Sequence, residues 1–291
     1  MSDSQNPEQG GHTERSYPMP AASESDKEML RLDEMHLAVT HYLGGKLSLA
    51  PIADIHPRKI LELGCGSGAW AIQAGKEFPD AEVVAADISP LPNREILRNM
   101  SFKLMNLTKE WVWEKETFDV VHARFVMIYV SDAENVIKRA AQLLKPGGLL
   151  LLEEPDMNSA AETGGPALQR SMSRFLQLWR SSAGADPELG KKLGDIITST
   201  GHFPDVHVDK ISVPLAGNGP DEAKNGLGRA LNKSWMRGLD DAESRMVAQG
   251  LVPDSMIKEQ KEQLEDSNCT AVLDEYFCWA QRALDQSRGL I

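Results

Sequence analysis

A short run of glycines is the segment of this 291-residue chain that could most directly carry chemistry. It follows an apolar stretch, 59–63, and reads Glu62-Leu63-Gly64-Cys65-Gly66-Ser67-Gly68. Glycine allows backbone torsions that other residues avoid and lets a ligand approach the main chain closely. A carboxylate, Asp87, ends the next apolar stretch. An acid at that place can accept hydrogen bonds from both hydroxyls of a ribose, so the pattern predicts a cofactor that contains a nucleoside.

The elements that must position this loop alternate between strands and helices. The predicted strands of the first half are 59–63, 82–86, 101–105, 118–122 and 149–153. Helical patterns follow the first and the fourth of these strands, and the second helix opens with the capping-box sequence Ser131-Asp132-Ala133-Glu134. This alternation is typical of a parallel sheet covered by helices on both faces.

The segments before and after these alternating strands and helices are a polar N-terminal stretch and mainly helical patterns. Residues 1–25 are polar and rich in Ser, Gly and Pro, and we expect a disordered tail. Apolar residues at helical spacing predict a helix over 25–43. We therefore predict one domain over 26–291, in which 26–50 form a helical lid. Later predictions are helical cap insertions at about 157–185 and 221–266, a helix at 189–200, and strands at 206–213 and 275–281.

Composition argues against several classes of partner. The chain has 31 Lys and Arg against 43 Asp and Glu, a net charge of −12, so nucleic-acid binding is not expected. Its three cysteines are too few for a disulfide framework and lack zinc-site spacing. No signal sequence and no apolar run of about 18 residues occur, so we expect a cytoplasmic protein that does not bind membranes.

Two cofactors fit the glycine run when it is considered alone. The spacing Gly64-x-Gly66-x-x-Ala69 also satisfies the dinucleotide fingerprint, which leaves a nicotinamide cofactor open. Two further features favour S-adenosyl-L-methionine. They are Glu62 before the glycines and the later turn Leu144-Lys145-Pro146-Gly147-Gly148.

With these features together, the chain resembles the class I S-adenosylmethionine-dependent methyltransferases. It looks most similar to the LaeA-like methyltransferases of fungal secondary metabolism, and the resemblance is clear over about 17–154. The segments that carry it are Arg31-Leu32-Asp33 with His36, Gly45-Lys46-Leu47 before Ala50-Pro51-Ile52, and Phe118-Asp119-Val120-Val121-His122-Ala123-Arg124-Phe125. Asn106-Leu107 depart from the pattern, because the family has acidic residues there.

The resemblance implies an α/β fold with a Rossmann-like sheet of seven strands, the last of them antiparallel, and helical cap elements. It also implies S-adenosyl-L-methionine as cofactor and S-adenosyl-L-homocysteine as product. Gly64, Gly66 and Gly68 would flank the amino-acid portion, Asp87 would hold the ribose, and Ile88, Asn106 and Leu107 would border the adenine. The other predicted cofactor-binding residues are Glu62, His122, Ala123 and, from a lid, Tyr17 and Arg31.

His122, Arg124 and His36 are the candidate catalytic residues. Methyl transfer mainly requires alignment, and only acceptors such as phenols or amines need a base. His122 could be that base or a spacer at a strand end, and His36 a pocket or a core residue. Arg124 could bind a carboxylate or pair with Glu153 or Glu154. No metal is expected, because the acids Glu153, Glu154 and Asp156 have no specific ligand spacing.

We therefore predict a methyltransferase that acts on an oxygen, of a phenol or a carboxylate, in a small secondary metabolite. The first alternative is a LaeA-like regulator or scaffold that acts through protein partners. The second is an NAD(P)-dependent oxidoreductase. The expected partner is the small-molecule acceptor, and a homodimer is left open. The sequence does not identify the acceptor, because a fold does not fix its substrate.

Overall fold

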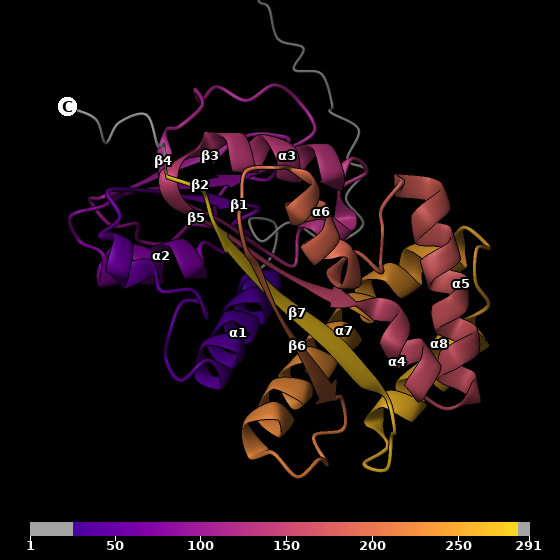
Figure 1. Ribbon diagram of the computed structural model, residues 1–291. Coiled ribbons are helices and arrows are strands. Elements are labelled where there is room, and N and C mark those ends of the chain that lie inside the picture. Colours follow the sequence, from indigo (N-terminus) through magenta and orange to yellow (C-terminus); the bar gives the residue numbers. More distant parts are fainter. Residues whose placement is uncertain (1–25, 285–291) are drawn as a thin grey trace, which may run out of the picture.

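Seven strands form one sheet through the part of the protein that the computed structural model describes, residues 26–284 (Figure 1). Their order across the sheet is β3-β2-β1-β4-β5-β7-β6. The strands are β1 (Lys59–Leu63), β2 (Glu82–Asp87), β3 (Met100–Leu104), β4 (Phe118–Arg124), β5 (Leu144–Asp156), β6 (Val206–Pro214) and β7 (Val272–Gln281).

The direction of the strands confirms the predicted fold class. Strands β1 to β5 pair in parallel, whereas β7 runs antiparallel to both of its neighbours, β5 and β6. The carboxyl ends of β1, β2 and β4 therefore meet at one edge, where ligands bind in sheets of this kind. The last strand enters the sheet between β5 and β6, whereas the dinucleotide-binding sheet typically has the strand order 3-2-1-4-5-6.

The fifth strand is longer than the sequence predicts. It begins at Leu144 instead of 149, and it contains the Lys-Pro-Gly-Gly segment that was expected to be a turn. A bulge lies opposite, where the pairing register shifts between Phe118 and Val120. Gly147 has φ +81°, and a Cβ on Gly148 would lie 2.9 Å from the backbone oxygen of Asp119. Glycines thus let the chain pass from helix into strand with no separate turn.

Eight α-helices occur in the described residues, with three short 3-10 helices. The α-helices are α1 (Asp26–Tyr42), α2 (Ala69–Glu77), α3 (Ala133–Leu143), α4 (Met157–Thr163), α5 (Pro166–Ala183), α6 (Leu193–Ser199), α7 (Glu222–Ala248) and α8 (Asp254–Glu265). The 3-10 helices are η2 (Ile52–Ile55), η3 (Met127–Tyr129) and η4 (Gly190–Lys192). The predicted helix over 189–200 is therefore η4 followed by α6. The predicted capping box does not form, since the N-cap of α3 is Asp132 and its side chain makes no capping bond.

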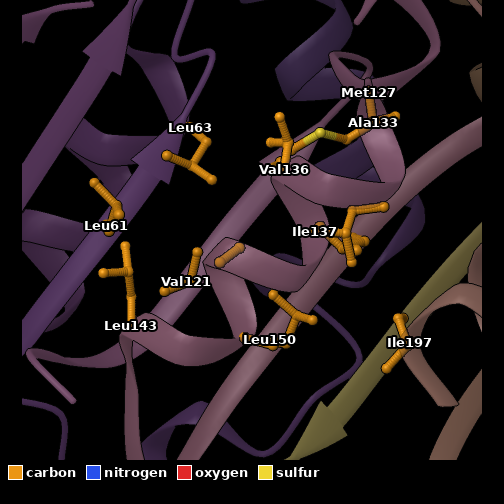
Figure 2. Packing of buried hydrophobic residues seen from close by; sticks show 14 of the residues in the cluster. Leu61, Leu63, Val121, Met127, Ala133, Val136, Ile137, Leu143, Leu150 and Ile197 are labelled. Atoms are coloured by element: carbon orange, nitrogen blue, oxygen red, sulfur yellow. The ribbon is translucent and has the colours of Figure 1, made fainter. Parts of the chain in front are cut away.

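Alternating side chains of the strands build two cores, one on each face of the sheet. Leu61, Leu63, Val121 and Leu150 face α3, where Val136 and Ile137 pack against them (Figure 2). The neighbouring residues Ile60, Val120, Leu149 and Leu151 face the opposite side and pack with Trp70 of α2. Apolar residues on both faces of the central strands are expected where helices cover a parallel sheet on both sides.

A third apolar cluster joins the helices outside this alternation. It combines α1, α4, α5, α7 and α8 with one end of β6 and β7 (Figure 1). The predicted cap regions thus contain helices, and α1 packs along α7. Among residues 26–284, no helix has both the length and the apolar character needed to cross a bilayer.

Candidate active site

A cavity of about 220 Å³ lies beyond the carboxyl ends of β1, β2 and β4, beside α1. Its walls come from the glycine loop, the ends of β2 and β3, the segment after β4 and one face of α1. Of the residues that the sequence predicts for the site, these line it: Arg31, His36, Glu62, Gly64, Gly66, Asp87, Ile88, Asn106, Leu107, His122 and Arg124. Residues distant in sequence therefore meet at one place.

Two of the predicted residues that the structure describes are not part of the cavity wall. Gly68 is the N-cap of α2, with φ +78°, and Ala123 is buried in the core on the α3 side of the sheet. Tyr17 lies outside the described residues. The structure adds wall residues that sequence reasoning missed, among them Glu28 and Tyr129. Glu28 could have been found, since it precedes Arg31 by three positions on a predicted helix; no sequence signal marks Tyr129.

The glycine loop closes tightly onto the end of β2. Gly64 and Gly66 have φ +69° and +53°, and a Cβ on Gly64 would lie 2.3 Å from a methyl of Val126. The backbone nitrogens of Gly64 and Cys65 both donate to the oxygen of Ala86, over 2.7 and 3.0 Å. The loop thus requires glycine both for its torsions and for its packing.

Asp87 is bound to the same loop by its side chain. Its Oδ2 accepts from the backbone nitrogen of Gly66 over 2.8 Å, and its Oδ1 accepts from that of Ser89 over 2.9 Å. Burial raises the pKa of Asp87, while these backbone donors act in the opposite direction. Each carboxylate oxygen has a second lone pair. The fixed carboxylate can therefore accept further hydrogen bonds from a ligand.

The segment after β3 is held by hydrogen bonds of its own. The Oδ1 of Asn106 accepts from the backbone nitrogen and the hydroxyl of Thr108, both over 2.9 Å. The backbone oxygen of Leu107 accepts from the indole of Trp111 over 2.9 Å and from Arg139. Since its Oδ1 is already engaged twice, Asn106 has mainly its amide hydrogens to offer to a ligand.

Glu62 and His122 are neighbours on β1 and β4. The Glu62 Oε2 accepts from the backbone nitrogen of Ala71 over 3.0 Å, and its Oε1 lies 3.9 Å from His122 Nδ1. The His122 ring stacks on the ring of Trp70, with 3.8 Å between the ring centroids. Neither ring nitrogen of His122 has a hydrogen-bond partner among the described atoms. Burial raises the pKa of Glu62 to about 8 and lowers that of His122. The geometry favours a neutral, packed imidazole, and catalysis by His122 stays a prediction.

Arg124 pairs with Glu153, its neighbour in the β4–β5 register. Its Nη2 also donates to the backbone oxygen of Leu47 over 3.1 Å, and its Nη1 lies 3.5 Å from His36 Nδ1. Glu154 projects from the other face of β5 and accepts from the backbone nitrogens of Val126 and Met127. Of the two pairings considered for Arg124, the structure therefore shows the one with Glu153.

Both ring nitrogens of His36 are engaged. Its Nε2 lies 2.8 Å from Gln73 Oε1, and the Gln73 amide nitrogen donates to the backbone oxygen of Gly45. Because the Gln73 side chain presents its oxygen to His36, Nε2 of the ring must carry the proton. Nδ1 is then the acceptor that faces Arg124. Burial, followed by the charge of Arg124, lowers the pKa of His36 to about 4. His36 is thus a neutral link between α1, α2 and β4.

The three acidic residues near the end of β5 point to different partners. Glu153 and Glu154 project from opposite faces of the strand, and Asp156 accepts from the backbone nitrogen of Asn158 as the N-cap of α4. Among the side chains that the structure describes, no group of three or more His, Cys, Asp or Glu has an arrangement that could hold a metal ion.

Comparison with known proteins places this site in a family. The methyltransferase domain model matches residues 36–191, which contain the glycine loop, Asp87 and the segment after β4. Methyltransferase str2 of Strobilurus tenacellus is 35% identical over 77% of this chain and 81% of its own. Methyltransferase str3 of the same organism is 34% identical over 80% and 82%. The chain therefore belongs to the methyltransferase domain family.

Two other similarities bear on the predicted relationship. The secondary metabolism regulator laeA of Coprinopsis cinerea is 31% identical over 49% of this chain but only 36% of its own. The structure of Haemonchus contortus phosphoethanolamine N-methyltransferase 2, in complex with phosphomonomethylethanolamine and S-adenosylhomocysteine, has a TM-score of 0.50. It is 18% identical and covers 78% of this chain and 49% of that one, a likeness that shows the fold.

Proposed function

We propose that this protein transfers the methyl group of S-adenosyl-L-methionine to an oxygen, phenolic or carboxylic, of a small secondary metabolite. The observation that carries the proposal is that one cavity joins the glycine loop and Asp87 to a face of α1. Two ligands that meet in one cavity can react, because the protein holds them in the required alignment. The family match and the str2 and str3 methyltransferases support the same reaction class.

The residues at the cofactor end fit a nucleoside with an amino-acid tail. Gly64 and Gly66 leave the backbone open to a ligand, Asp87 would accept from the ribose hydroxyls, and Ile88 and Leu107 would border the adenine. When bound, the cofactor supplies a methyl group already activated on a sulfonium. What this chain must add is orientation of the acceptor and exclusion of water.

We propose that Arg124 and His36 hold the neighbouring elements in place and that neither residue transfers a proton. Arg124 connects β5, through Glu153, with the residues around α1, through His36 and Leu47. His36 has no free basic nitrogen, since Gln73 and Arg124 occupy both. A carboxylate acceptor is ionised at neutral pH and needs no base, so these contacts are compatible with it.

A LaeA-like regulator that acts through protein partners is the alternative that the laeA similarity favours. That similarity spans about a third of the laeA protein, whereas str2 and str3 match over most of their length. The greater coverage of str2 and str3 supports the proposal that this protein is an enzyme. The nicotinamide-dependent alternative lacks support, given the methyltransferase family match and the antiparallel β7.

Two measurements test the proposal. Calorimetric titration with S-adenosyl-L-homocysteine should show binding, and titration with NAD and NADP should show none. Incubation with methyl-labelled S-adenosyl-L-methionine and a panel of phenols, carboxylic acids and amines should then give a labelled ether or ester, identified by mass. Binding of NAD alone would refute the methyltransferase. Label confined to amines would refute the oxygen acceptor, and label on a partner protein would favour the regulator.

A further inference from the structure

A buried ion pair on α1 borders the cavity. Arg31 binds both oxygens of Glu28, with Nε 2.7 Å from Oε2 and Nη2 2.6 Å from Oε1. The third nitrogen, Nη1, donates to the hydroxyl of Ser234 on α7 over 2.5 Å. Both members of the pair line the cavity, and their exposed fractions are 7% and 6%. The planar guanidinium fork thus already holds a carboxylate, the group that best matches its geometry.

The interactions of the pair run toward Ser234 of α7 and toward Tyr129 of η3. Leu32 contacts the loop, since its Cδ1 would lie 3.0 Å from a Cβ on Gly66. Successive residues of a helix differ in direction by about 100°, and the side chain of Arg31 turns instead toward α7. The charges of Arg31 and Glu28 both act on Tyr129, which also lines the cavity.

The two arginines of the cavity are held differently. Arg124 is paired with Glu153, which belongs to a central strand and is not part of the cavity wall. Glu28 is a wall residue and stands in the first turn of α1, at the end of the helix. A carboxylate brought by a ligand could therefore take the place of Glu28 on Arg31, whereas the strand pairing of β4 and β5 fixes Glu153.

We propose that Arg31 is the carboxylate-binding residue of the acceptor subsite and that Glu28 occupies its fork until a substrate arrives. The acceptor is then a small carboxylic acid whose apolar body packs against Met35, Phe125 and Tyr129. This assignment rests on the proposed methyltransferase function and narrows its acceptor. The methionine portion of the cofactor also has a carboxylate, so the experiment must separate the two sources.

The test is calorimetric titration of phenylacetate into the full-length protein saturated with S-adenosyl-L-homocysteine. Glu28→Gln removes the competing carboxylate charge and should tighten phenylacetate binding about tenfold, while Arg31→Lys should weaken it by a similar factor. Neutral 2-phenylethanol should bind equally to all variants. Glu34→Gln is the matched control. It removes an exposed carboxylate of α1 that pairs with Lys233 of α7, and it should leave the affinity unchanged.

Each result has a defined meaning. Unchanged phenylacetate affinity in Glu28→Gln, or the same gain in Glu34→Gln, would show that the pair only fastens α1 to α7 and would overturn the assignment. Tighter binding of S-adenosyl-L-homocysteine to Glu28→Gln, with no gain for 5′-methylthioadenosine or phenylacetate, would assign the fork to the cofactor and also overturn it. Failure of the wild-type protein to bind S-adenosyl-L-homocysteine would instead refute the proposed function itself.

Discussion

The carboxylate of Asp87 accepts a hydrogen bond from the backbone nitrogen of Gly66 over 2.8 Å. This bond connects the end of β2 with the loop that follows β1. The residue predicted to bind the ribose, Asp87, and the glycine loop predicted to hold the amino-acid portion of the cofactor are therefore linked directly. A change at either residue should therefore affect cofactor binding before it affects the sheet.

Asp87→Ala should weaken binding of S-adenosyl-L-homocysteine at least about tenfold. Hydrogen bonds to a charged group contribute roughly 1.5–3 kcal/mol, and ~1.4 kcal/mol corresponds to one decade of affinity. Calorimetry measures the effect, with circular dichroism to establish folding. Asp119→Ala is the control, since Asp119 accepts from the backbone nitrogens of Arg58 and Lys59 at the opposite end of the sheet. Equal affinity in folded Asp87→Ala would remove this residue from the site.

Gly64→Ala should destabilise the protein more than Gly201→Ala. Both glycines have a positive φ, +69° and +71°, which costs an alanine roughly 1–2 kcal/mol. A Cβ at Gly201 meets nothing within 4 Å, whereas one at Gly64 would lie 2.3 Å from Val126, and such overpacking adds roughly 1–3 kcal/mol. Urea denaturation compares the two variants. Equal losses of unfolding free energy in the two variants would mean that Val126 moves aside freely.

Glu154 should make the protein less stable as the pH rises. Burial raises its pKa from 4.5 to about 8. Between these values the unfolded chain releases the proton and the folded chain keeps it, so the contribution of Glu154 to stability is full below pH 4.5 and is lost as the pH rises toward 8. Glu154→Gln keeps an oxygen for the nitrogens of Val126 and Met127 and removes the titration. Its melting temperature should fall less than that of wild type between pH 6 and pH 8; parallel curves would contradict this.

Chelation should leave turnover intact. Methyl transfer from a sulfonium to an ionised oxygen needs alignment rather than a Lewis acid. The carboxylates of Glu153 and Glu154 are also held apart, by Arg124 on one side of β5 and by the backbone nitrogen of Val126 on the other. Turnover of an identified acceptor is measured with and without excess EDTA. A loss of turnover that magnesium restores would contradict the prediction.

The sequence was sufficient to predict the features that neighbouring residues encode. An apolar strand, a glycine loop and a helix follow one another directly, so the loop between β1 and α2 could be placed from the chain alone. The ends of parallel strands also meet at one edge, which brought Glu62, Asp87 and His122 to the same cavity. Strand limits were less predictable, because pairing with neighbouring strands extends β5 and β7 beyond the segments that the sequence marks. Leu144 at the start of β5 pairs with β4, the end of β5 pairs with β7, and the start of β7 pairs with β6.

Only the tertiary structure decided which partner each charged group has. The alternation of side chains along β5 gives Glu153 to Arg124 and sends Glu154 to the other face, a choice that depends on the register of β4 against β5. Arg31 meets Ser234 of α7 although 203 positions separate them in the chain. Local patterns determine where a strand or helix forms, but contacts between distant segments depend on how the elements pack together, and this packing shapes the wall of the cavity.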